Sequence, residues 1–299
     1  MGADDAASSG SRRRGWSVLE IVESEAFSGW QRVARADLIT AMLEVTVLAS
    51  GSSGNALLVR SGDCSLLVDA GLSARRLATC LLACGVDPGS LSGILLTHEH
   101  GDHTRGLKVF VDKHHVPVFA TPLTADHLKR TGIGARWNLF SSGSAFALES
   151  IEVLPFSVPH DAADPVGFVL RSNGTGFAVL TDLGCATRQV VESVRGVHAL
   201  LIETNHDESL LQNDARRPWS VKQRILSRHG HLSNSAAAEV VAEVATDALR
   251  HVLLAHLSRD CNSPELAVHA VGSRLRGRPA VRIQCARVDE ESPMLRLVV

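Results

Sequence analysis

The segment 94-ILLTHEHGDHTRGL-107 places three histidines and two acids within six residues, directly after an apolar run. Along a straight strand side chains alternate between faces, whereas a turn at the end of the strand lets them converge. His98 and His100 can then meet one metal ion, and Asp102 and His103 a second one nearby. Imidazole and carboxylate groups suit Zn²⁺, Mn²⁺ or Fe. This segment therefore predicts a strand end that carries metal ligands.

Three further polar residues end apolar runs later in the chain. His160 follows 151-IEVLPFSVP-159, Asp182 ends 176-GFAVLTD-182, and His256 ends 252-VLLAH-256. For any one of them alone, a hydrogen-bonded structural role is as good an interpretation as metal ligation. Together and in this order, they supply the further ligands that a pair of metal ions needs.

Short apolar segments alternate with amphipathic ones from residue 43 onward, which is typical of an α/β sandwich. The pattern predicts strands at residues 43–49, 55–60, 65–69, 94–97, 117–120, 151–156, 166–171, 176–181, 199–203 and 252–256. It predicts helices at residues 73–85, 104–114, 122–131, 185–194, 219–226, 233–247 and 263–274.

A faint internal repeat links two of these strands. The segment 66-LLVDAGLSARRL-77 aligns with 179-VLTDLGCATRQV-190, so that Asp69 matches Asp182 and Gly71 matches Gly184. Downstream, 94-ILLTHEH-100 has a counterpart in 201-LIETNHD-207, again a strand that ends in polar residues. Two similar halves that face each other would bring both sets of strand ends to one edge.

Composition limits the class of protein. The 299 residues, 45% of them hydrophobic, suit one large domain or two small ones. A net charge of −2 excludes a chain that is basic throughout. The six cysteines form no CxxC pair, which favours a reducing, cytoplasmic setting. No apolar run approaches the ~18 residues that span a membrane.

The beginning of the chain differs from the rest. MGADDAASSGSRRRG is small, polar and charged, which is typical of disorder. Residues 16–40 can form a loose helix, and strand patterning begins at Met42. Residues 1–41 are therefore either a short extension or a segment before the true start of translation, and residues 42–299 are the folded domain.

The order HxHxDH, His, Asp, His resembles the metallo-β-lactamase superfamily. The resemblance implies a four-layer αβ/βα sandwich over residues 42–299, with two facing mixed sheets flanked by helices and two divalent metal ions at one edge. It implies that the first metal is held by His98, His100 and His160, that the second is held by Asp102, His103 and His256, and that Asp182 bridges them. Asp69 would orient the motif loop by hydrogen bonds.

That resemblance also implies a mechanism. Two cations lower the pKa of a bridging water, so that metal-activated hydroxide attacks at neutral pH. Asp102 would share the proton of this water. His231, in 230-GHLSN-234, resembles a histidine that protonates the leaving alkoxide, and the alternative is a histidine that packs beside a helix cap.

Six separated strings, among them LASGSSGNALLV, LLTHEHGDH and LLAHLSRDCNSPELA, closely resemble the YycJ (WalJ) subfamily of bacterial metallo-hydrolases. This implies a 5′→3′ exonuclease that acts on DNA ends and is linked to mismatch repair. Asp182 stands where a class B1 lactamase would carry cysteine. An aspartate that bridges two metals suits phosphodiester substrates better.

Several other residues are candidates for substrate binding. Ser53 and Asn55 lie in a Gly/Ser loop whose backbone N–H groups could face phosphate, or which is simply a tight turn. Asn205 and His206 end the second-half strand and could bind a phosphate or a DNA end. The basic stretch 216–228, which contains Trp219, could bind DNA or form a solvated helix face.

Two other functions stay open at this point. The fold hosts many reactions, so the substrate can instead be a small thioester, lactone or cyclic phosphodiester. A signalling or scaffold protein with a relic metal site is the non-enzymatic alternative. The sequence leaves the oligomeric state open.

Overall fold

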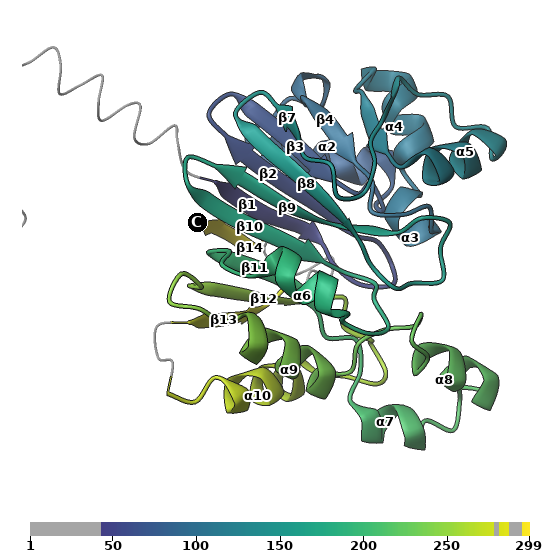
Figure 1. The fold of residues 1–299 in the computed structure, drawn as a ribbon. Helices are drawn as coiled ribbons and strands as arrows, with labels where there is room; N and C mark the ends of the chain where they lie inside the picture. Colours follow the sequence, from purple (N-terminus) through teal and green to yellow (C-terminus); the bar gives the residue numbers. More distant parts are fainter. Residues whose placement is uncertain (1–42, 278–280, 287–294) are drawn as a thin grey trace, which may run out of the picture. The chain divides into compact units, whose positions relative to one another are not determined.

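The computed structural model describes residues 43–277, 281–286 and 295–299. Within these residues the strands form two seven-stranded mixed sheets (Figure 1). In spatial order the first sheet contains β14 (Leu295–Val298), β1 (Glu44–Ala49), β2 (Ala56–Ser61), β3 (Cys64–Val68), β4 (Gly93–Leu95), β5 (Val118–Ala120) and β6 (Trp137–Leu139). The second contains β13 (Arg282–Cys285), β12 (His251–Ala255), β11 (Ala199–Glu203), β10 (Thr175–Leu180), β9 (Val166–Ser172), β8 (Ile151–Ser157) and β7 (Phe146–Leu148).

Helices cover the outer face of each sheet. The segments of the first half are α2 (Ala74–Ala83), η1 (Pro88–Ser90), α3 (Gly101–Thr104), α4 (Leu107–His114) and α5 (Pro122–Arg130). Those of the second half are α6 (Arg188–Val194), α7 (Glu208–Asn213), α8 (Trp219–Ile225), α9 (Asn234–Val244) and α10 (Pro264–Arg274). Buried side chains of α2, α4 and α5 pack on the first sheet, and those of α6, α9 and α10 pack on the second.

The alternation of side chains along each strand builds the layers. In β11, Ala199 and Leu201 join the core between the two sheets, whereas Leu200 and Ile202 face the helices of the second half. Both faces of the strand are buried, which explains why it reads as a continuous apolar run. The structure thus confirms the predicted four-layer sandwich.

The strands and helices predicted from the sequence are present, with small shifts at their ends. The prediction missed β6, β7, β13 and β14, which have only three or four residues each, too few to establish a period. It also missed the short helix α7. The helix predicted at 104–114 is present as α4 but begins three residues later, because the chain turns at Gly106 after the separate short helix α3. A Cβ on Gly106 would lie 2.0 Å from the Leu72 carbonyl oxygen.

The predicted extension at 1–41 and the loose helix at 16–40 lie outside the described residues. Among the helices that are described, each is too short or too polar to cross a membrane.

Candidate metal centre

Three of the predicted site residues lie one or two positions after the end of a strand and have a left-handed backbone. The φ angles are 61° at Asp69, 51° at Asp182 and 56° at His256. Few residues other than glycine adopt this conformation, and it turns the chain sharply. Asp69 and Asp182 are the two positions that the internal repeat aligns, so both halves use the same turn to direct an acid into the site. Such strained backbone is common at functional sites.

The glycines of the repeat let the loops of the site approach closely. A Cβ on Gly71 would lie 1.7 Å from the carbonyl oxygen of Asp102. A Cβ on Gly184 would lie 2.4 Å from the backbone at Arg228 and Gly230. Each glycine therefore allows one half's strand-end turn to pack against a loop that carries site residues.

One group of possible ligands consists of His98, His100 and His160, whose ligand nitrogens lie within 4.8 Å of one another. His160 Nε2 is 3.3 Å from His100 Nδ1, and its Nδ1 is 3.1 Å from the carbonyl oxygen of Gly230. Nε2 of His98 is buried and has no hydrogen-bond partner among the described residues. A buried nitrogen without a partner is costly unless something binds it.

The second group consists of Asp102, His103 and His256, whose ligand atoms also lie within 4.8 Å of one another. Asp102 Oδ2 is 3.6 Å from His103 Nε2 and 3.5 Å from His256 Nε2. Asp182 links the two groups. Its Oδ2 is 3.1 Å from His103 Nε2, and its carboxylate can also share a metal ion with His98 and His103.

Asp69 forms hydrogen bonds with both ends of the motif loop, residues 97–103. Its Oδ2 accepts a hydrogen bond from His103 Nδ1 at 2.7 Å, and its Oδ1 accepts one from the Thr97 backbone N–H at 2.9 Å. Because the proton is on Nδ1, the other ring nitrogen of His103, Nε2, is the one that can bind a metal ion beside Asp102 and Asp182. A carboxylate behind a histidine fixes its tautomer and ring orientation in this way in metal sites.

Sequence reasoning missed Glu203, the last residue of β11. Its side chain is fully buried. Oε1 accepts hydrogen bonds from His231 Nδ1 at 2.7 Å and His256 Nδ1 at 2.8 Å, and Oε2 accepts two backbone N–H bonds, from Leu183 and Leu232, at 3.1 Å each. The signal was an acid at the end of an apolar strand, the same signal that pointed to Asp182.

The charges of the site depend on one another. Burial opposes ionisation of Asp182 and Glu203, but neighbouring histidines outweigh it, so the pKa of Asp182 lies well below its usual range and that of Glu203 falls to about 2. Burial likewise opposes the charged form of His103, yet Asp69 and Asp182 raise its pKa to about 10. The clustered carboxylates thus require nearby positive charge. The imidazole nitrogens and carboxylate oxygens of the two groups fit divalent cations in number and kind.

His231 lies beside both groups without being deeply buried. Its side chain is 24% exposed, and its ring centroid is 5.3 Å from those of His160 and His256. Burial would lower its pKa, but Glu203 raises it. Nδ1 is engaged by Glu203, which leaves Nε2 as the nitrogen that can act on a substrate.

The tentative substrate residues lie in different surroundings. Ser53 is exposed on the β1–β2 turn, whereas Asn55 is buried with its Nδ2 3.0 Å from His103 Nε2. The side chain of Asn205 donates to the His256 carbonyl oxygen at 3.1 Å. His206 is buried, and neither ring nitrogen has a hydrogen-bond partner in the described part of the chain. Their roles in substrate binding stay predictions.

Acidic side chains pair with three of the five lysines and arginines in the basic stretch 216–228. Arg216 and Arg217 pair with Asp214 and Asp260. Arg224 pairs with Asp161 at 2.6 Å, and Lys222 donates to the carbonyl oxygen of Gln212. These ion pairs reduce the positive charge that the stretch offers to nucleic acid, while Lys222 keeps its charge and the exposed Arg228 has no ion pair in the described part of the chain. Trp219 is 62% exposed.

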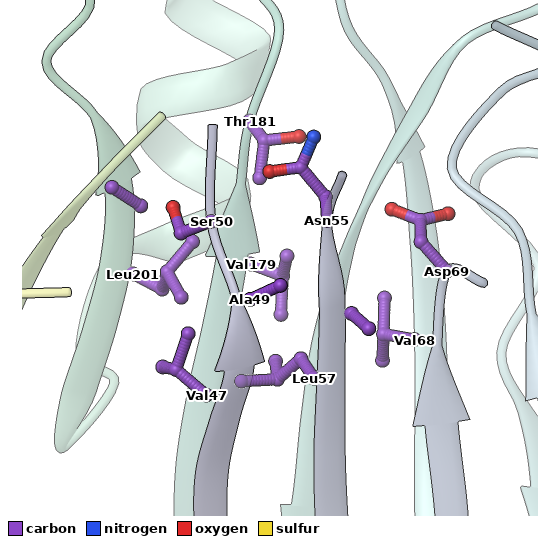
Figure 2. Close-up of a pocket in the computed structure, with 12 residues that line it drawn as sticks. Val47, Ala49, Ser50, Asn55, Leu57, Val68, Asp69, Val179, Thr181 and Leu201 are labelled. Atoms are coloured by element: carbon purple, nitrogen blue, oxygen red, sulfur yellow. The ribbon is translucent and has the colours of Figure 1, made fainter. Parts of the chain in front are cut away.

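Directly below the strand ends, a cavity of about 20 Å³ lies between the two sheets. Figure 2 shows Asn55, Thr181 and Asp69 at its polar end and the apolar side chains of Val47 and Leu57 deeper in. The volume suits about one water molecule. The change from apolar to polar lining marks the boundary between the core and the site.

Comparison with known proteins agrees with this geometry. The model of the beta-lactamase superfamily domain matches residues 65–257. The chain belongs to the metallo-β-lactamase superfamily. It is 40% identical to Exodeoxyribonuclease YycJ of Bacillus anthracis over 236 residues, which cover 78% of this chain and 89% of the relative. It is 34% identical to Exodeoxyribonuclease WalJ of Streptococcus pneumoniae over 227 residues, 74% of this chain and 84% of the relative.

A solved structure shows the same fold at low identity. The metallo-β-lactamase fold protein YhfI of Bacillus subtilis superposes with a TM-score of 0.67 and 15% identity, over 87% of this chain and all of that one. With its family, its fold and its clustered histidines and acids, this superfamily member is a metal-dependent hydrolase.

Proposed function

We propose that this protein is a dinuclear-metal exonuclease that degrades DNA from its ends in the 5′→3′ direction. The observation that carries the proposal is a pair of adjacent ligand groups joined by Asp182, in a chain 40% identical to an exodeoxyribonuclease over most of its length. Two metal ions side by side suit in-line displacement at a phosphodiester.

The ligand assignment follows the two groups. His98, His100 and His160 would hold one cation. Asp102, His103 and His256 would hold the other, with Asp182 between them. The donor set accepts Zn²⁺ or Mn²⁺, and also Fe. When bound, the cations acidify water and neutralise charge on the attacked phosphate.

The chain's own residues complete the reaction. Water oxygen bonds to phosphorus while the bond from phosphorus to the leaving 3′ oxygen breaks. Nε2 of His231 gives its proton to that oxygen, because Nδ1 is held by Glu203. Asp102, 21% exposed at the mouth of the second group, takes up the proton from water. A positioned general acid of this kind is worth ~10²–10⁴ in rate.

We further propose that this exonuclease activity serves DNA repair. We also propose a cytoplasmic setting, which the free thiols of the buried Cys64 and Cys261 support, because thiols stay reduced in that compartment.

The test is degradation of 5′-phosphorylated duplex DNA with added Mn²⁺ or Zn²⁺. The variants His98→Ala and Asp182→Ala should abolish it, while the variant of an exposed histidine on α5, His127→Ala, should retain it. Loss of nucleotides from the 5′ end that both site variants remove would support the proposal. If the metal-loaded protein leaves DNA intact but hydrolyses a thioester, lactone or cyclic phosphodiester, the small-substrate function replaces it.

A further inference from the structure

Two arginines from distant parts of the chain meet on the turn between β1 and β2. Nη1 of Arg105 donates to the carbonyl oxygen of Ser53 at 2.6 Å, and Nη2 of Arg259 donates to its hydroxyl oxygen at 3.1 Å. Both arginines and Ser53 are exposed. Each guanidinium has five N–H donors in a planar fork, so one bond to Ser53 orients the fork and leaves most of its donors open to solvent.

Neither of these arginines is bonded to a carboxylate in the described part of the chain. In contrast, Arg216 and Arg217 of the basic stretch are paired with acids. Asp260 is the sequence neighbour of Arg259, but its oxygens bond Arg216 and Arg217 instead. The positive charges of Arg105 and Arg259 are therefore not offset by a neighbouring carboxylate and can attract an anionic ligand.

The arginine pair lies beside the second ligand group. Arg105 follows Asp102 by three residues, about one turn of helix, and Arg259 follows His256 by three. The turn that they hold is also bonded to the site, since Ser50 Oγ accepts the His256 backbone N–H at 2.8 Å and Asn55 contacts Asp102. An anion between the two guanidiniums would thus lie next to the reacting phosphodiester without occupying its place.

We propose that Arg105 and Arg259, oriented by Ser53, bind the terminal 5′ phosphate of the DNA strand that the enzyme degrades. This inference rests on the proposed function. In a strand cut from its 5′ end, the terminal phosphate lies one nucleotide from the scissile bond, which matches an anion site beside the metal ligands. A terminal phosphate carries more charge than an internal one, and arginine forks bind such groups through paired charge-assisted bonds.

The experiment compares kcat/KM on duplex DNA with a 5′ phosphate and with a 5′ hydroxyl. The wild-type protein should prefer the phosphate by about tenfold or more, since charge-assisted bonds reach that range. In the double variant Arg105→Gln/Arg259→Gln the ratio of the two kcat/KM values should fall close to one, mainly because KM for the 5′-phosphorylated DNA rises. The double lysine variant should keep part of the preference. The matched control Arg274→Gln, on α10 and paired with Glu239, should keep the full preference.

A binding measurement separates the possible failures. Fluorescence anisotropy gives the binding constant of 5′-phosphorylated DNA at several salt concentrations. The slope of the logarithm of this constant against the logarithm of salt concentration should become smaller by about one per arginine removed. If the double variant binds the 5′-phosphate and the 5′-hydroxyl DNA more weakly by the same factor, the arginines hold an internal phosphate and the terminal assignment is wrong. An unchanged preference in that variant also overturns it. If the wild-type protein degrades neither substrate, the proposed function fails, and this inference fails with it.

Discussion

The substitution Glu203→Gln tests the reasoning about the site most directly. It keeps the size of the side chain and removes one acceptor. In the wild-type protein Oε1 accepts from two imidazoles and Oε2 from two backbone N–H groups. Whichever way the glutamine amide is placed, its NH₂ group faces two donors. If it faces the imidazoles, they must release their Nδ1 protons, and the tautomer that leaves Nε2 of His256 free is lost.

The magnitude follows from the number of bonds. At least two of four hydrogen bonds to a buried carboxylate are lost, each worth about 1.5–3 kcal/mol. The variant should therefore be destabilised by about 3 kcal/mol or more, which lowers the melting temperature by about 6 °C or more for a domain of this size. Loss of the group that orients a ligand should also weaken metal binding about 10–100-fold.

The assays are calorimetric melting and metal content after dialysis at limiting free Zn²⁺. The control Glu192→Gln breaks an exposed ion pair with Arg195 and should melt as the wild-type protein does. A Glu203→Gln protein that melts at the wild-type temperature and keeps its metal would refute the account of Glu203 as the acceptor that holds both imidazoles.

Three further outcomes are expected. Gly71→Ala should destabilise the protein by about 3 kcal/mol or more, because its Cβ would meet the Asp102 carbonyl oxygen, whereas Gly101→Ala, with open space around it, should be tolerated; urea unfolding compares them. Asp69→Asn should weaken Zn²⁺ binding about 10–100-fold in calorimetric titration, since His103 loses its orienting carboxylate. Removing metal with a chelator should lower the melting temperature, because binding at about 100 times Kd adds about 2.7 kcal/mol.

The candidate site residues at strand ends are predictions, and the structure brings them close together. The motif loop, His160, Asp182 and His256 could be found from the sequence because each is a polar residue after an apolar run, and the ends of strands in facing sheets share one edge. Glu203 has the same signature but was passed over in favour of its neighbours Asn205 and His206, whose side chains the fold buries. The contacts of the basic stretch could not be read from the sequence either, since Arg224 pairs with Asp161, 63 residues away.

By itself, the amino-acid sequence determined the sandwich, the family and the strand ends that carry the candidate ligands, because hydrophobic periodicity and motif order are local properties. Only the tertiary structure decided which atom meets which. Two imidazoles share Glu203 from positions 28 and 53 residues away, and Arg259 reaches Ser53 across 206 residues. Hydrogen bonds require donor and acceptor within about 3 Å in a defined direction, and packing of the two halves, not spacing along the chain, sets those distances.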